Sequence, residues 1–103
     1  MERTYIGDLG GKATETVLIK GWVDVRRDQG KMVFFDFRDV SGKVQGVVLP
    51  KSEAMPAAQK VRPEWVLEVR GKVNKRPEKN INPEQLNGEI ELEIKEIKVL
   101  NEA

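Results

Sequence analysis

Apolar and polar residues alternate along most of the chain, and this period of two is typical of β-strands with one buried face. In the first run, every odd position from Val17 to Val25 is either apolar or glycine. Five such runs predict five strands, which span approximately residues 17–26, 32–38, 43–49, 65–73 and 89–99. The turn signals Asp28-Gln29-Gly30 and Ser41-Gly42 separate the first three runs, so residues 31–49 predict a β-hairpin.

Two segments between the runs have a different character. In residues 50–61, Ser52 is placed to cap a short helix, and Pro56 restricts that helix to its first turn or interrupts it. Residues 75–88 are rich in proline, asparagine and glutamine and predict a long polar loop. In the last run the apolar phase slips by one position at Lys95-Glu96, which predicts a β-bulge or a barrel corner.

The order of elements is three strands, a short helical connection and two more strands. This is the order of the OB-fold, an all-β, five-stranded Greek-key barrel with a short helix between strands 3 and 4, which often binds oligonucleotides. Glycines at apolar-face positions let strongly coiled strands bend, and three occur here: Gly21, Gly46 and Gly71. Other small barrels and sandwiches share the same number of strands. A length of 103 residues suits one core, so residues 1–103 are expected to form one domain.

The chain contains no cysteine and no histidine. Disulfides and thiolate metal sites are therefore excluded, and the commonest general base and metal ligand are missing. No catalytic constellation and no metal motif emerges, so the chain is a poor candidate for an enzyme when taken alone. No apolar run is long enough to span a membrane, and the N-terminus lacks the layout of a secretory signal. We expect a cytoplasmic protein with no membrane partner.

Charge is unevenly distributed, although the formal net charge is only +1. Residues 60–79 carry seven Lys or Arg against three Glu, and residues 80–103 carry six Glu against two Lys. A basic zone beside an acidic zone can orient a polyanion such as a nucleic acid. A mixed, solvated β-sheet surface explains the same distribution.

Phe34 is the most informative candidate for a binding residue. Its neighbours Phe35 and Phe37 take the core face by parity, so Phe34 is expected on the outer face. An outward aromatic ring is a platform on which a nucleobase stacks, at roughly 1–3 kcal/mol per base. Alternatively, Phe34 packs beneath a loop or beneath the N-terminal segment. On the same strand, Arg38 and Asp39 are expected to form a structural ion pair near the turn.

Gln45 and Glu91 share the outward parity on other strands. An amide donates and accepts, and a carboxylate accepts, so together they can read the Watson–Crick edges of unstacked bases. Arg26 and Arg27 end the first strand and point to opposite sides, so one can bind a phosphate while the other faces a base. For each of these four residues, a solvated surface position is the alternative.

The loop over residues 76–83 carries candidates of two kinds. Asn80 and Asn82 provide amides for base edges or sugars, while Arg76 and Lys79 provide phosphate contacts. Loops between the last two strands of OB-folds commonly wrap the nucleic acid. The asparagines are also ordinary turn residues.

These residues carry a resemblance to a known family. The first half resembles the anticodon-binding domain of class IIb aminoacyl-tRNA synthetases, through Gly21-Trp22-Val23, Arg26-Arg27-Asp28, Gly30, Phe34, Asp36, Arg38-Asp39, Gly42 and Val44-Gln45. The second half resembles the bacterial aspartyl enzymes more than their asparaginyl or lysyl relatives, through Arg62, Val69, Gly71-Lys72-Val73, Arg76, Asn80-Ile81-Asn82 and Gly88-Glu89-Ile90-Glu91. The resemblance covers essentially the whole chain.

The resemblance implies a role for each candidate. Phe34 would stack on the central uridine of the anticodon, with Arg27 and Gln45 hydrogen-bonding around it. Residues that would read or position the flanking anticodon bases are Arg76, Asn80, Asn82 and Glu91. Backbone or secondary contacts would come from Arg26, Arg62 and Lys79.

The resemblance also implies that the barrel is the N-terminal part of a longer enzyme, an aspartate–tRNA ligase. Its partner would be the anticodon loop of the aspartate tRNA rather than DNA. ATP and Mg²⁺ would act in a separate catalytic domain of a homodimeric enzyme, and the barrel would need neither cofactor nor metal. Three alternatives remain: the matching domain of an asparaginyl-tRNA synthetase, a free-standing binder of single-stranded nucleic acid, and a barrel that binds only protein.

Overall fold

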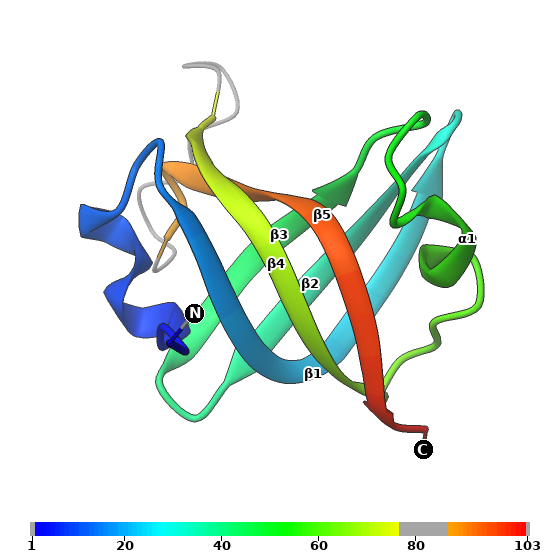
Figure 1. Ribbon diagram of the computed structural model, residues 1–103, viewed down its shortest axis with the longest axis horizontal. Coiled ribbons are helices and arrows are strands. Elements are labelled where there is room, and N and C mark those ends of the chain that lie inside the picture. The colour runs from blue at the N-terminus through cyan, green and yellow to red at the C-terminus, as the bar shows by residue number, and fades with distance from the viewer. Residues whose placement is uncertain (1, 77–86, 103) are drawn as a thin grey trace.

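Within residues 2–76 and 87–102, which the computed structural model describes, five strands close into a barrel in the order β1-β2-β3-β5-β4 (Figure 1). The strands are β1 (Thr16–Gln29), β2 (Met32–Asp39), β3 (Gly42–Val48), β4 (Val66–Lys75) and β5 (Ile90–Asn101). A 3-10 helix, η1 (Ile6–Gly11), precedes β1, and a short helix, α1 (Met55–Ala58), lies between β3 and β4. The predicted all-β barrel with a helix between strands 3 and 4 is confirmed, whereas η1 had no sequence signal that we recognised.

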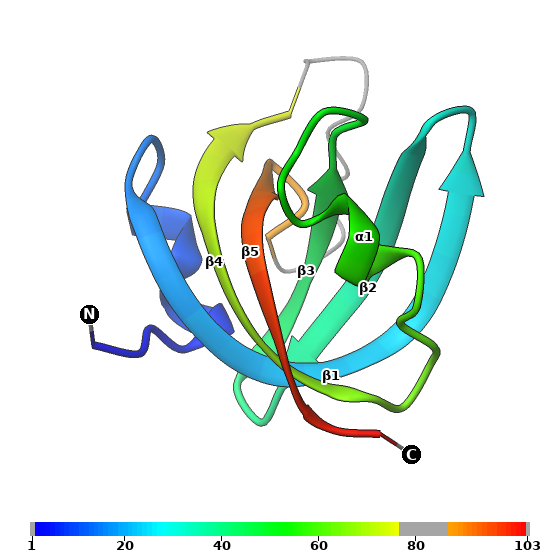
Figure 2. The ribbon, with the colours of Figure 1, turned by 45° about the vertical axis from the view of Figure 1, so that its right-hand side comes forward.

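Curvature of β1 and a short parallel contact close the barrel. Residues 16–22 of β1 pair with β4, and residues 22–29 pair with β2, so one bent strand serves two neighbours (Figure 2). The remaining gap is closed by β3 and β5, which run parallel and join through two pairs, Gly46 with Leu92 and Val47 with Glu93. We call these two pairs the β3–β5 seam. The other four strand pairings are antiparallel.

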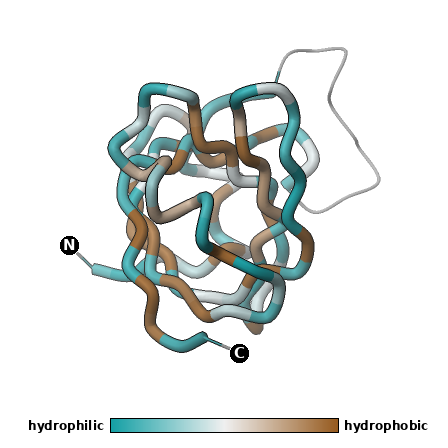
Figure 3. Tube along the Cα trace, turned by 90° about the vertical axis from the view of Figure 1, so that its right-hand side faces the viewer, coloured by the Kyte–Doolittle hydropathy of each residue, from teal (hydrophilic) through white to brown (hydrophobic). Residues whose placement is uncertain are grey.

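Alternate residues of each strand fill the barrel interior, because successive side chains point to opposite faces. Phe35 and Phe37 of β2 are fully buried, as are Ile19 of β1, Val69 of β4 and Leu92 of β5. Most positions between these buried residues are polar, so hydrophobic and hydrophilic stretches alternate along the trace (Figure 3). The outer surface of the sheet is therefore free to carry polar chemistry without disturbing the core.

The first three strands are connected by two-residue loops, Gly30-Lys31 and Val40-Ser41. Each loop lies within one residue of the turn that the sequence predicted, and the predicted hairpin over residues 31–49 is confirmed. Gly30 has a positive φ of 62°, a conformation that glycine adopts without steric cost and that suits tight hairpin loops.

The short helix α1 packs Ala58 into the core at one end of the barrel. Pro56 stands in its first turn, as expected. The expected cap at Ser52 is wrong, because the N-cap residue is Ala54 and no side chain caps this helix. Instead, Ser52 Oγ donates a hydrogen bond to the carbonyl oxygen of Ile94 on β5 (3.2 Å) and accepts one from the backbone nitrogen of Ala54 (3.1 Å). The segment before α1 is thereby tied to β5.

Two β-bulges change which residues of β1 and β5 point away from the barrel interior. In β5 the pairing with β4 skips Lys95, since the residues on either side of it pair with Gly71 and Arg70. The bulge predicted at this position is confirmed. Another bulge, at Asp24 of β1, was not predicted. It reverses the facing of the residues that follow, so Val25 lies on the outside with 39% of its surface exposed, and its predicted place on the core face is wrong.

Two of the core-face glycines allow one backbone to approach another very closely. A Cβ added to Gly21 would lie 2.2 Å from the carbonyl oxygen of Arg38, and one added to Gly71 would lie 2.6 Å from that of Glu93. No side chain fits at these distances. These glycines are therefore needed for the tight curvature of β1 and β4, which is the role that the sequence predicted for them.

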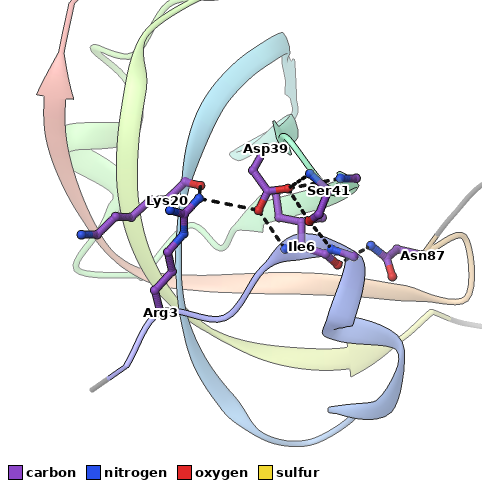
Figure 4. Close-up of polar contacts among 8 residues, drawn as sticks. Arg3, Ile6, Lys20, Asp39, Ser41 and Asn87 are labelled. Atoms are coloured by element: carbon purple, nitrogen blue, oxygen red, sulfur yellow. Dashed lines mark hydrogen bonds and ion pairs between the residues drawn. The ribbon is translucent and has the colours of Figure 1, made fainter.

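The N-terminal segment is held on the barrel by Asp39, whose side chain is only 1% exposed (Figure 4). The Asp39 carboxylate accepts hydrogen bonds from the backbone nitrogens of Ile6 (2.9 Å), Ser41 (2.7 Å) and Gly42 (3.1 Å), and from Ser41 Oγ (2.6 Å). Arg3 Nη2 lies 4.0 Å from the same carboxylate. Burial raises the pKa of Asp39, but these hydrogen bonds outweigh it, so the pKa lies below its ordinary value.

Two further contacts complete this region. Asn87 Nδ2 donates to the carbonyl oxygen of Lys43 (3.0 Å) and to that of the first residue of η1 (2.9 Å), which links the start of the chain to the start of β5. The ion pair expected between Arg38 and Asp39 is wrong. Arg38 Nη1 instead lies 3.5 Å from a carboxylate oxygen of Asp24, the bulged residue of β1.

We expect Gly21→Ala to lower the free energy of unfolding by about 2–3 kcal/mol, because its methyl group would overlap the backbone of β2. The matched control is Gly10→Ala, since a Cβ at Gly10 meets nothing within 4 Å. Urea unfolding followed by tryptophan fluorescence measures both. Equal stability of the two variants would contradict the close approach.

We expect Asp39→Ala to cost about 2–4 kcal/mol at neutral pH, because buried hydrogen bonds to a charged group are lost. The folded-state pKa lies below the unfolded value of about 3.9, so this contribution is present above that value and is lost as the pH falls through the folded-state pKa. Urea unfolding at neutral and acidic pH should show the difference between wild type and variant shrinking in acid. The exposed Asp8→Ala is the control. A difference independent of pH would count against this account.

Candidate nucleic-acid interface

Two neighbouring rows of outward side chains cross the barrel surface. Cross-strand pairs join the first row, which runs Arg27, Phe34, Val47, Glu93 and Lys72 across β1, β2, β3, β5 and β4. The second row runs Val25, Asp36, Gln45, Glu91 and Asn74 over the same strands. In this row Gln45 and Glu91 become neighbours because each precedes a residue of the parallel β3–β5 seam. We call these ten residues the outer face. It brings together four of the predicted site residues.

Phe34 lies near the centre of the outer face and is partly buried. Its cross-strand neighbours are Arg27 and Val47, and Val47 is only 5% exposed although it points outward. The N-terminal segment does not cover Phe34, because its hydrogen bonds reach Asp39 and Ser41, about 16 Å away along β2. The outer face therefore has an apolar centre formed by Phe34 and Val47, with part of the ring open to a ligand.

Arg27 is held beside Phe34 by Asp36. Its two terminal nitrogens donate to the two carboxylate oxygens, each at 3.2 Å, so the guanidinium group is fixed in a bidentate pair. Arg27 keeps 40% of its side chain exposed and can donate further hydrogen bonds. Sequence reasoning missed this role of Asp36, although its shared parity with Phe34 was visible.

Arg26 points to the opposite side of β1 from Arg27. Its side chain is 15% exposed and donates to Asp28 at 2.9 Å. Its Nε is buried and has no hydrogen-bond partner among the described residues. The structure therefore does not bring Arg26 onto the outer face, and its contact with RNA backbone stays a prediction.

The pKa values of the two glutamates of the outer face are shifted in opposite directions. Burial raises the pKa of Glu91, and the positive charge of Arg76 only partly opposes this. A hydrogen bond from Lys95 lowers the pKa of Glu93, and Asn74, whose Nδ2 donates at 3.0 Å, lowers it further. The ionised form of Glu93 is therefore favoured, and the positive charge of Lys95 compensates its negative charge. Glu91 is a poorly solvated acceptor, which suits a base amine.

The other predicted residues lie around this face or outside the described part of the chain. Arg76 Nε donates to the carbonyl oxygen of Ile90 at 2.9 Å, which holds Arg76 at the end of β4 beside Glu91. Arg62 follows α1 and donates to the carbonyl oxygen of Val61 at 3.1 Å; the described contacts do not bring it to the outer face. The predictions at Lys79, Asn80 and Asn82 fall outside the described residues.

Pairing of β4 with β5 also explains the two charge zones. Arg70 of the basic zone forms an ion pair with Glu96 of the acidic zone, and Lys72 lies opposite Glu93. The zones therefore neutralise each other in part, as the interpretation of a mixed surface proposes. Residues 2–76 and 87–102 contain no cluster of three acidic, histidine or cysteine residues suited to a metal ion. No helix in these ranges has the length and apolarity needed to cross a membrane.

Comparison with known proteins gives consistent matches. Residues 17–100 match the profile of a family described as an OB-fold nucleic acid binding domain. An aspartate–tRNA(Asp/Asn) ligase of Natranaerobius thermophilus is 47% identical over 98% of this chain, and an aspartate–tRNA ligase of Geobacillus kaustophilus is 45% identical over 100% of it. The chain spans 18% of the length of each relative. Among solved structures, an aspartyl tRNA synthetase from Entamoeba histolytica superposes with a TM-score of 0.86 at 26% identity, covering 100% of this chain and 22% of the other.

We expect NMR titration of the side-chain carboxyl carbons to give Glu91 a pKa above its ordinary value. Arg76→Gln should raise it further, because the positive charge that stabilises the ionised form is removed. Lys98→Gln, which removes the same charge near the other end of β5, is the control. A lower pKa of Glu91 in the Arg76 variant would show that the two side chains do not interact in this way.

Proposed function

The chain belongs to the family of OB-fold nucleic acid binding domains, and on this premise we propose that it binds the anticodon loop of a tRNA. The observation that carries the proposal is the outer face, where Phe34 lies between a fixed guanidinium group and the seam of the barrel. A partly open ring provides stacking, and the polar groups of the second row provide hydrogen bonds to base edges. Unpaired loop bases expose both their ring faces and their Watson–Crick edges.

Five residues of the outer face, and Arg76 beside it, have distinct parts in this proposal. Phe34 stacks on the central base of the anticodon, and Arg27, fixed by Asp36, donates to that base or its phosphate. Gln45 donates to and accepts from a base edge, as a uridine requires. Glu91 accepts from an exocyclic amine of a neighbouring base, and the positive charge of Arg76 favours the ionised form of that carboxylate. The barrel fixes two of these groups before the RNA arrives, Arg27 through Asp36 and Arg76 through the carbonyl oxygen of Ile90.

We further propose that the chain is the anticodon-binding domain of an aspartate–tRNA ligase. Support comes from the names of its bacterial relatives, of which the chain matches 18% of the length. In this proposal the barrel selects the aspartate tRNA, and a separate catalytic domain of an ATP-dependent, homodimeric enzyme joins the amino acid to it. Residues 2–76 and 87–102 offer no cluster of acidic, histidine or cysteine side chains that could hold the Mg²⁺ of that reaction. Binding at the anticodon positions the distant acceptor end for that domain.

We expect Phe34→Ala to weaken binding of an RNA hairpin carrying the aspartate anticodon GUC by roughly 5- to 150-fold, the loss of one stacked base. Fluorescence anisotropy with a labelled hairpin measures the affinity. Tyr5→Ala is the matched aromatic control, since Tyr5 is exposed but lies on the N-terminal segment. Gln45→Ala should reduce the preference for GUC over a hairpin with a central cytidine, GCC.

The same assay separates the alternatives. A domain that serves the asparagine tRNA should prefer the anticodon GUU to GUC. A general single-strand binder should bind oligo-dT as tightly as the hairpin, and a barrel that binds only protein should bind neither. If Phe34→Ala and Gln45→Ala both leave hairpin binding unchanged, the proposed use of the outer face is wrong.

A further inference from the structure

A groove of 540 Å³ lies beside the outer face, between the segment that precedes α1 and the strands β4 and β5. Its lining includes four cationic and two acidic side chains: Lys51, Arg70, Lys72, Lys95, Glu53 and Glu93. The groove therefore has two more positive than negative charges, in a protein whose net charge is only +1. We call it the cationic groove.

The cationic groove continues the first row of the outer face. Lys72 and Glu93 belong to both, and Lys72 lies opposite Glu93 where β4 pairs with β5. From Phe34 to Lys72 the row crosses three strand spacings, about 14 Å along the sheet surface. A polymer strand with a base on Phe34 therefore reaches the groove without leaving the protein surface.

The walls of the cationic groove are fixed by features of the fold. On one side, the hydrogen bond from Ser52 to the carbonyl of Ile94 ties the segment that carries Lys51 to β5. On the other side, the bulge at Lys95 leaves two successive residues of β5, Lys95 and Glu96, exposed. The groove is thus built from an anchored segment and a bulged strand.

The charged side chains of the groove differ in how far they are already paired with a group of opposite charge. Glu93 accepts a hydrogen bond from Lys95, and Arg70 is paired with Glu96 outside the groove. These pairs leave Lys51 and Lys72 as the exposed cations with the least compensation. Exposed ammonium groups in a groove attract the negative charges of a phosphodiester chain, which lysine binds as a point charge.

We propose that the cationic groove binds the phosphate backbone of the same RNA strand whose base stacks on Phe34. This inference rests on the proposed function and extends the binding site from β2 around the barrel to β4. The outer face reads the bases, and the groove holds the backbone beside them without reading sequence. The exposed side chain of Leu49 lies in the groove wall and packs against ribose.

The test is the salt dependence of binding by the double variant Lys51→Gln, Lys72→Gln. Anisotropy titrations with the GUC hairpin over a range of salt concentrations give the slope of log affinity against log salt. We expect weaker binding at low salt and a slope smaller by about 1.4, since each phosphate contact to a single strand contributes about 0.7. The preference for GUC over GCC should stay unchanged, because no base contact is lost.

The matched control is the double variant Lys12→Gln, Lys98→Gln, which removes the same charge away from the cationic groove. It should change the slope less than the groove variant does. Equal slopes for the two double variants would overturn the groove proposal. If Phe34→Ala still weakens binding in that case, the proposed function stands and only the backbone site is wrong. If wild type shows no preference for the hairpin, the proposed function itself fails.

Discussion

The β3–β5 seam is the contact on which the binding surface depends. It consists of two residue pairs, yet it joins the hairpin half of the barrel, β1 to β3, to the pair formed by β4 and β5. Phe34 and Gln45 lie on one side of it, and Glu91, Glu93 and Lys72 on the other. Without the seam these residues would lie at opposite ends of one open sheet, because β1 would still pair with β4. The close backbone approaches at Gly21 and Gly71 provide the curvature that lets so short a seam form.

Most of the fold was predictable because the barrel has a simple period. Alternation located all five strands, and the phase slip at Lys95 revealed a bulge because the apolar residues themselves changed parity. The bulge at Asp24 left no such trace, because Val25 is apolar and continues the old alternation after it has turned outward. The helix η1 was missed because its buried residues, Ile6 and Leu9, are too few to show a helical period.

The alternation of inward and outward positions along each strand and the family resemblance were the only signals from which the site could be predicted. Parity placed Phe34 and Gln45 outward, which the structure confirms, but it could not show which side chains hold which others. The bidentate pair between Arg27 and Asp36 depends on the register of β1 and β2, and the unseen bulge sets that register. The cationic groove likewise brings together residues from distant parts of the chain, and no local pattern marks it.

The bulge at Lys95 also affects how the protein behaves at high concentration. Beyond the seam, β5 pairs with β4 on one side, and its other side is an edge among the described residues. Such an edge offers free peptide groups to a second molecule and is a common start of aggregation. Here it carries Lys95, Glu96 and Lys98, all exposed and charged, and the bulge breaks the flat ladder that an added strand would need. The bulge that shapes the cationic groove thus also protects an open sheet edge against self-association.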